Sequence, residues 1–206
     1  SSHSSYRGLG VKRGLEILKK VKEKYSIRTL TDIHLPQQAA LASKSVDILQ
    51  IPAFLCRQTD ILSAAASTEC IVNVKKGQFM SPEDMVNVVS KLKHYQAGEI
   101  WLTERGTTFG YNRLVVDYTG IPVMQETGCP VIFDATHSVQ RPGGMGTSSG
   151  GNREFVEPLA KAAAAVGVDG FFFETHPNPD KALSDGPNMV PLKEFEGMLT
   201  RVLSKS

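Results

Sequence analysis

The chain has 206 residues, of which 41% are hydrophobic and 21% are charged, an ordinary composition for a globular protein. Its formal net charge is +2 at pH 7, so the overall charge does not indicate binding to nucleic acid or to an anionic membrane. The sequence has no apolar run of about 18 residues and no apolar signal core near its start, so we expect neither a transmembrane helix nor secretion. The three cysteines, Cys56, Cys70 and Cys129, are widely spaced, and we expect them to be buried, reduced thiols of a cytoplasmic protein.

Helical patterns and short apolar runs alternate along the chain. In chain order we predict helix Val11–Tyr25, strand Arg28–His34, helix Pro36–Ser43, strand Asp47–Phe54, helix Thr59–Ser67, strand Ile71–Lys76, helix Ser81–His94, strand Ile100–Arg105, helix Asn112–Thr127, strand Val131–His137, helix Arg153–Val166, strand Gly170–His176 and helix Leu192–Leu203. Most of the strands are almost continuously apolar, which is typical of a parallel sheet covered on both faces. Ser81-Pro-Glu-Asp predicts a helix start, and Gly120 and Pro122 interrupt the fifth helix.

This alternation predicts one α/β domain built from βα units. A (β/α)8 TIM barrel needs eight strands and about 250 residues, whereas this chain has six predicted strands and begins with a helix. The pattern therefore leaves two alternatives open: an open doubly wound sheet, or a barrel without its first two units.

Every predicted strand runs into polar or titratable residues. These ends are Asp32-Ile-His34, Gln50-Ile-Pro-Ala-Phe54, Lys75-Lys76-Gly-Gln78, Glu104-Arg105-Gly106, Asp134-Ala-Thr-His137 and Glu174-Thr-His176. Because ligands of parallel α/β folds bind where the strand carboxyl ends converge, the six ends together predict an active site.

Lys75, Lys76 and Arg105 at two of these ends, with Arg57 after a third, are suited to binding phosphate and carboxylate groups. The alternative for Lys76 and Arg57 is a solvated basic rim. Lys75 fits that alternative less well, because it directly continues an apolar run.

His137, Glu174 and Asp185 could bind Zn²⁺, Fe²⁺ or Mn²⁺, since one nitrogen and two carboxylate ligands suit these ions. The alternative is a hydrogen-bonded histidine beside structural acids. The glycine-rich segment 143–151 reads as a flexible loop that ends at a helix N-terminus, where phosphate can bind. Because no GxxxxGK[ST] motif is present, we expect no nucleotide P-loop.

At these residues the chain resembles the 3-deoxy-D-manno-octulosonate 8-phosphate synthase family. The matching stretches, in family order, are SYRG, TDIH, LQIPAFLCRQTD, NVKKGQF, LTERGTTFGYNRLVVD, VIFDATHSVQRPGG, SGGNREF, AVGVDGFFFETHPNPDKALSDGPN and PLKEFE. The resemblance implies a TIM barrel, usually assembled as a homotetramer. It also implies condensation of phosphoenolpyruvate with D-arabinose 5-phosphate, release of inorganic phosphate, and a role in lipopolysaccharide assembly or plant cell-wall pectin synthesis.

The resemblance also implies site residues. Lys75 and Arg105 would hold the phosphate and carboxylate of phosphoenolpyruvate, with Gln50 and Ala53 shaping that pocket. Ser1 and Arg57 would contact the phosphate of arabinose 5-phosphate. Phe54 is a further substrate-binding position, and Asp32 and Gln78 would line the site. Arg57 would reach the site of a neighbouring subunit. His137, Glu174 and Asp185 match the family's metal positions, and we count Lys75, Arg105, Asp32 and His137 as the catalytic set.

The first two strands of the family are absent from this chain, and they carry further substrate residues and the cysteine that is a ligand in metal-dependent members. TERGTTFGY and DATHSVQRPGG favour a metal-dependent enzyme, whereas DGPN, preceded here by Ser184, is less decisive. Two rival readings remain. One is 3-deoxy-D-arabino-heptulosonate 7-phosphate synthase, which uses erythrose 4-phosphate, and the other is an inactive fragment that acts only as an oligomer subunit.

Overall fold

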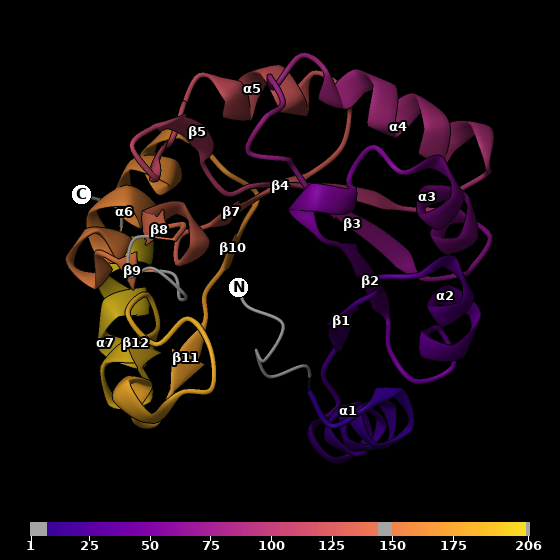
Figure 1. Cartoon of the computed structure of the whole chain (residues 1–206), viewed down its shortest axis with the longest axis horizontal. Coiled ribbons are helices and arrows are strands. Elements are labelled where there is room, and N and C mark those ends of the chain that lie inside the picture. The colour runs from indigo at the N-terminus through magenta and orange to yellow at the C-terminus, as the bar shows by residue number, and fades with distance from the viewer. Residues whose placement is uncertain (1–7, 144–149, 205–206) are drawn as a thin grey trace. The chain divides into compact units, whose positions relative to one another are not determined.

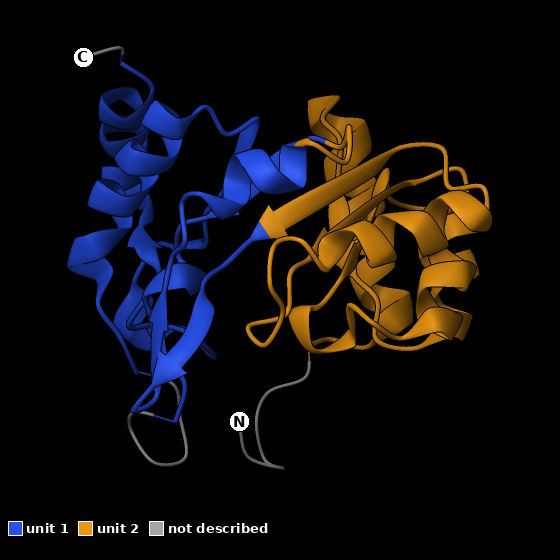
Figure 2. Ribbon diagram, turned by 90° about the horizontal axis from the view of Figure 1, so that it is seen from above, with its two compact units in different colours: residues 1–6, 104–125, 130–206 blue, residues 7–103, 126–129 orange. Residues whose placement is uncertain are grey.

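The computed structural model describes residues 8–143 and 150–204, which form two compact units (Figure 2). Unit 2 contains residues 8–103 and 126–129, and unit 1 contains residues 104–125, 130–143 and 150–204.

Unit 2 is built from parallel strands, each preceded by a helix. The strands are β1 (Leu30–Asp32), β2 (Ile48–Ile51), β3 (Ile71–Lys75) and β4 (Ile100–Glu104), paired in that order. The helices are α1 (Val11–Tyr25), α2 (Pro36–Ala42), α3 (Thr59–Ala66) and α4 (Met85–His94), with a short 3-10 turn η1 (Ala53–Leu55) after β2. Helices α2, α3 and α4 stand side by side on one face of these strands (Figure 1).

The burial of the strands of unit 2 explains why their sequences are almost continuously apolar. All residues of β2 and β3 are buried. Leu49, Val72 and Leu102, from three neighbouring strands, are completely inaccessible to solvent. Burial of each such side chain contributes about 1.5–3 kcal/mol, so the apolar strands are the main source of this unit's stability.

Unit 1 contains two parallel strands, β7 (Val131–Asp134) and β10 (Gly170–Phe172), whose register pairs Phe133 with Phe171. Its helices are α5 (Gly120–Gln125), α6 (Val156–Val166) and α7 (Leu192–Leu203). Its small two-stranded pairs are β5 (Thr107–Gly110) with β6 (Arg113–Val115), β8 (Gln140–Arg141) with β9 (Gly150–Gly151), and β11 (Thr175–His176) with β12 (Val190–Pro191). The 3-10 turns are η2 (His137–Val139), η3 (Arg153–Phe155) and η4 (Pro179–Lys181).

The predicted βα alternation is confirmed: all six predicted strands are present, and the helices Val11–Tyr25 and Leu192–Leu203 have the predicted bounds. The protein is therefore a mixed α/β protein whose main strands, the six predicted from the sequence, pair in parallel, as in TIM-like folds. No helix within residues 8–143 and 150–204 is long and apolar enough to cross a membrane.

Two predicted helices were wrong in part. The fifth is only Gly120–Gln125, because residues 107–115 form a hairpin whose turn residues Tyr111 and Asn112 have left-handed backbones, with φ of 52° and 54°. The fourth begins at Met85, because Ser81 caps a separate turn: its Oγ accepts from the Asp84 amide at 3.3 Å.

Candidate active site

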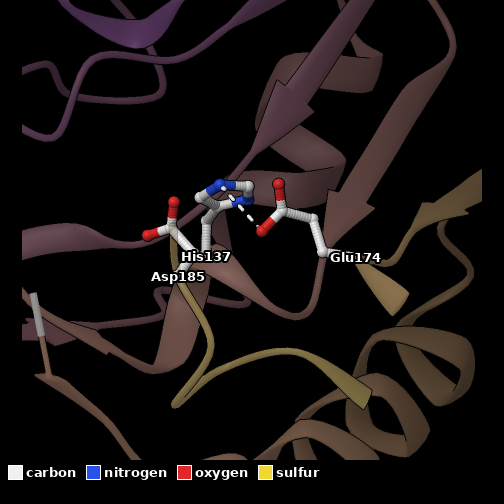
Figure 3. Close-up of side chains that lie close together, drawn as sticks. All are labelled: His137, Glu174 and Asp185. Carbon is white, nitrogen blue, oxygen red and sulfur yellow. Dashed lines mark ion pairs between the residues drawn. The ribbon is translucent and has the colours of Figure 1, made fainter. Parts of the chain in front are cut away.

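His137, Glu174 and Asp185 come together in unit 1 (Figure 3). One potential ligand atom from each lies within 4.8 Å of the others. Parallel pairing explains the approach of the first two, because Asp134 at the end of β7 is in register with Phe172 at the end of β10. His137 and Glu174 follow these paired residues, whereas Asp185 comes from the loop before α7.

The imidazole of His137 is oriented by Asp134. Its Nδ1 lies 2.7 Å from Oδ2 of Asp134, a side chain that is fully buried. Asp134 Oδ1 accepts from the His137 amide at 2.9 Å and from the Thr136 hydroxyl at 3.1 Å. The other ring nitrogen, Nε2, lies 3.7 Å from Oε2 of Glu174. A carboxylate on one nitrogen with ligands beside the other is the usual arrangement of a metal-binding histidine.

A second chain of contacts leads from this cluster to a buried cation. Arg105 is 5% exposed, and its Nη2 donates to Gln140 Oε1 at 2.7 Å. Gln140 Nε2 in turn donates to Asp185 Oδ1 at 2.6 Å. Burial lowers the pKa of Arg105, while the carboxylates of Asp134, Glu104 and Asp185 oppose that shift. The other guanidinium nitrogen, Nη1, is buried and makes no hydrogen bond within the described part of the chain.

Unit 2 contains a polar network across the carboxyl ends of its strands. The Thr103 hydroxyl donates to Asn73 Oδ1 (2.8 Å), Asn73 Nδ2 to Gln50 Oε1 (2.8 Å), and Gln50 Nε2 to Asp32 Oδ1 (2.5 Å). Thr103, Asn73 and Gln50 are buried, whereas Asp32 is exposed. All donors point toward the carboxylate, so a buried row of dipoles fixes one oxygen of an accessible acid.

The predicted cations of unit 2 differ in burial. Lys75 is the last residue of β3 and is buried. Lys76 is fully buried, and its Nζ donates to the Met80 carbonyl at 3.2 Å, so the solvated-rim alternative was wrong for this residue. Arg57 is exposed, as that alternative expected. Gln78 is buried, and its Oε1 makes no hydrogen bond to a described residue.

The sequence profile of the DAHP synthetase I family matches residues 1–204. The chain belongs to this family. It is 60% identical to a protein of Synechococcus sp. over 203 residues, which are 98% of this chain and 72% of that relative. It is 59% identical to a Rhodopseudomonas palustris protein over 98% of this chain and 71% of the relative, and 58% identical to a Cyanothece sp. protein over 99% and 75%. Each relative is named 2-dehydro-3-deoxyphosphooctonate aldolase.

The structure brings together some of the positions predicted from the family motifs. Arg105, His137, Glu174 and Asp185 form one connected cluster in unit 1. In unit 2, Asp32 and Gln50 share a hydrogen bond, Ala53 is buried and Phe54 is exposed. A pocket shared by Lys75 and the unit 1 cluster remains a prediction. Ser1 and the glycine-rich residues 144–149 lie outside the described residues.

Sequence reasoning missed three residues that orient these groups: Asp134, Gln140 and Asn73. The Asp-Ala-Thr-His spacing could have indicated Asp134, because a carboxylate that ends a strand can reach back to a nearby histidine. Nothing in the sequence distinguishes Gln140 or Asn73, because their partners are far away along the chain.

Proposed function

We propose that the protein condenses phosphoenolpyruvate with D-arabinose 5-phosphate and water, forming 3-deoxy-D-manno-octulosonate 8-phosphate and inorganic phosphate. This is the reaction of the 2-dehydro-3-deoxyphosphooctonate aldolases. The observation that carries the proposal is identity of 55–60% to proteins of that name over at least 98% of the chain. The motifs NVKKGQF and PAFLCRQTD favour this acceptor over erythrose 4-phosphate.

Phosphoenolpyruvate is assigned to Lys75 and Arg105. The substrate carries a phosphate and a carboxylate, and both must approach a second phosphorylated molecule. Buried cations offset that repulsion strongly, because water does not screen them. The buried Nη1 of Arg105 supports this assignment, since it has no other hydrogen-bond partner among the described residues. Gln50 and Ala53 would shape the same pocket.

The second substrate, D-arabinose 5-phosphate, is assigned to Asp32, Gln78, Phe54 and Arg57, together with Ser1. Asp32 presents an exposed carboxylate held by Gln50, which suits a sugar hydroxyl donor. Arg57 and Phe54 are exposed on unit 2, which is compatible with their reaching the site of another subunit. We also propose that the protein is a cytoplasmic homotetramer and that this chain belongs to a single TIM-barrel domain.

The reaction forms one carbon–carbon bond and one carbon–oxygen bond, the latter to water, and breaks the carbon–oxygen bond to phosphate. The electron pair of the enol double bond attacks from C3 to the aldehyde carbon, and the aldehyde oxygen takes up a proton to become a hydroxyl. Water adds at C2 with loss of a proton. The new C2 hydroxyl then loses its proton as the bond from C2 to the phosphate oxygen breaks; the leaving phosphate takes up a proton and departs as inorganic phosphate, which leaves the 2-keto acid. The residues must hold C3 against the aldehyde, because fixed orientation removes much of the entropic barrier.

His137, Glu174 and Asp185 fit a divalent metal such as Zn²⁺, Fe²⁺ or Mn²⁺. Asp134 holds Nδ1 of His137, so Nε2 is directed to the cluster with the two acids. A bound ion would supply positive charge that polarises and orients the aldehyde or the attacking water. His137 itself, with a fixed ring, would hold this end of the site in position.

The proposal is tested by measuring phosphate release with arabinose 5-phosphate and with erythrose 4-phosphate, using both this chain and a form extended by the first two strands of a family member. Arabinose 5-phosphate should give the higher kcat/KM. Lys75→Met should abolish most of this activity, whereas Lys20→Met, which removes an exposed cation of α1, should leave it unchanged. Preferred turnover of erythrose 4-phosphate would refute the substrate assignment. Negligible activity of both forms would favour the inactive subunit.

A further inference from the structure

Gln140 lies between two groups of opposite charge in unit 1. Its Oε1 accepts from Arg105 Nη2 at 2.7 Å, and its Nε2 donates to Asp185 Oδ1 at 2.6 Å. We propose that Gln140 is a positioning residue: it holds the substrate-binding arginine and the metal-binding aspartate in place and keeps them from pairing with each other. This inference rests on the proposed function, because that function assigns the two groups their ligands.

The chemistry of the two partners fixes the orientation of the amide. A guanidinium can only donate hydrogen bonds, and an ionised carboxylate can only accept them. The amide oxygen must therefore face Arg105, and the amide nitrogen must face Asp185. A flipped amide would place donor against donor and acceptor against acceptor. No single charged side chain satisfies both partners.

The backbone around Gln140 is anchored. Gln140 begins β8 and is paired with Gly151 of β9. Just before it, the Val139 carbonyl accepts from the Asn152 amide at 3.2 Å. The side chain therefore extends from a paired strand, which holds a connecting group more accurately than a free loop does.

Asp185 depends on such support. Its backbone is left-handed, with φ of 50°, a conformation that costs free energy for a residue with a Cβ. Its carbonyl accepts from the amides of Asn188 at 2.9 Å and Met189 at 3.3 Å, which stabilise the turn. The turn fixes the backbone, whereas Gln140 holds Oδ1 of the carboxylate that forms the cluster with His137 and Glu174.

If the Gln140 amide were removed, we expect the side chains of Arg105 and Asp185 to approach each other. Arg105 already feels the charge of Asp185, and its surroundings are largely desolvated, so the attraction between them is strong. A direct ion pair would take Arg105 from phosphoenolpyruvate and Asp185 from the metal. The neutral amide gives each a partner without neutralising it.

The test uses Gln140→Met, which retains the length of the side chain and removes both hydrogen bonds. Mn²⁺ binding is followed by the paramagnetic resonance of the free ion, and phosphoenolpyruvate binding by calorimetry, so neither measurement requires turnover. We expect Mn²⁺ affinity to fall by about tenfold or more and phosphoenolpyruvate affinity to fall by about tenfold. The matched control is Gln125→Met, because Gln125 also donates to an acid, Asp169, in the same unit. It should change neither affinity.

A second variant tests the ion pair itself. Adding Asp185→Asn to Gln140→Met removes the anion that would capture Arg105, so phosphoenolpyruvate affinity should return toward that of the parent. If Gln140→Met leaves both affinities within about twofold of the parent, the positioning role is refuted. If the parent itself fails to bind phosphoenolpyruvate, the proposed function fails instead.

Discussion

The buried hydrogen-bond chain of unit 2 makes a quantitative prediction. Thr103→Val removes one hydroxyl and leaves Asn73 Oδ1 without its donor. Asn73→Leu leaves two groups without partners, Gln50 Oε1 and the Thr103 hydroxyl. Since these side chains are at most 3% exposed, water cannot readily replace the lost bonds. Each buried polar group left without a hydrogen-bond partner costs about 1–3 kcal/mol. We therefore expect the free energy of unfolding to fall by about 2 kcal/mol for Thr103→Val and by about 4 kcal/mol for Asn73→Leu.

The assay is urea unfolding followed by the fluorescence of Trp101. It is the only tryptophan of the chain, and it lies on β4 in register with Asn73 of β3. Its signal therefore reports on the strands that the substitutions affect. The control is Thr200→Val, which removes an exposed hydroxyl bonded to the Glu196 carbonyl in α7 and should change stability by less than about 0.5 kcal/mol.

The comparison of the two losses in free energy of unfolding tests whether the hydrogen bonds form one network. If Asn73→Leu costs no more than Thr103→Val, the chain does not act as a continuous network. If both cost as little as the exposed control, the reasoning from buried unsatisfied groups is wrong for this sheet.

Three further predictions concern unit 1. Gly151→Ala should lower stability in urea by about 1–3 kcal/mol, because its Cβ would lie on the Asn188 side chain, and Asn188→Ala should recover most of that loss. Hydrogen bonds from Arg201 and Lys161 lower the pKa of Glu157 from 4.5 to about 2, so these pairs stabilise the fold above pH 4.5 and their contribution is lost as the pH falls toward 2. Glu157→Gln should therefore lower the Tm at pH 7 by roughly 1–2 °C, and melting curves of variant and parent should coincide in acid. Arg105→Lys should reduce kcat/KM by about a hundredfold, since lysine cannot reproduce the planar fork.

Sequence patterns predicted the interior of unit 2 well because β2, β3 and β4 are largely apolar. The predicted ends of the strands were less accurate. Val131–His137 was predicted as one strand, but β7 ends at Asp134, because the next residues turn so that His137 meets that carboxylate. Gly170–His176 likewise divides into β10 and β11 around Glu174. At these ends the requirements of the site override the local preference for strand.

The hairpin of β5 and β6 could not be predicted from the rules for turns. Its turn contains Tyr111 and Asn112 in left-handed conformation, and only asparagine is common there. A helix that begins at Asn112 was predicted instead. Side-chain partners were still less accessible to sequence reasoning, because Gln140 lies 35 residues from Arg105 and 45 from Asp185.

In both units, a side-chain amide forms hydrogen bonds to the charged residues of the candidate site. Gln50 holds Asp32, and Gln140 holds Arg105 and Asp185. An amide is suited to this role because it can donate and accept while it remains neutral. A counter-ion would hold these groups more firmly, but it would neutralise the charge that, under the proposed function, binds substrate or metal. His137 is the exception, with a charged partner on Nδ1, because a carboxylate there makes the opposite ring nitrogen a stronger ligand.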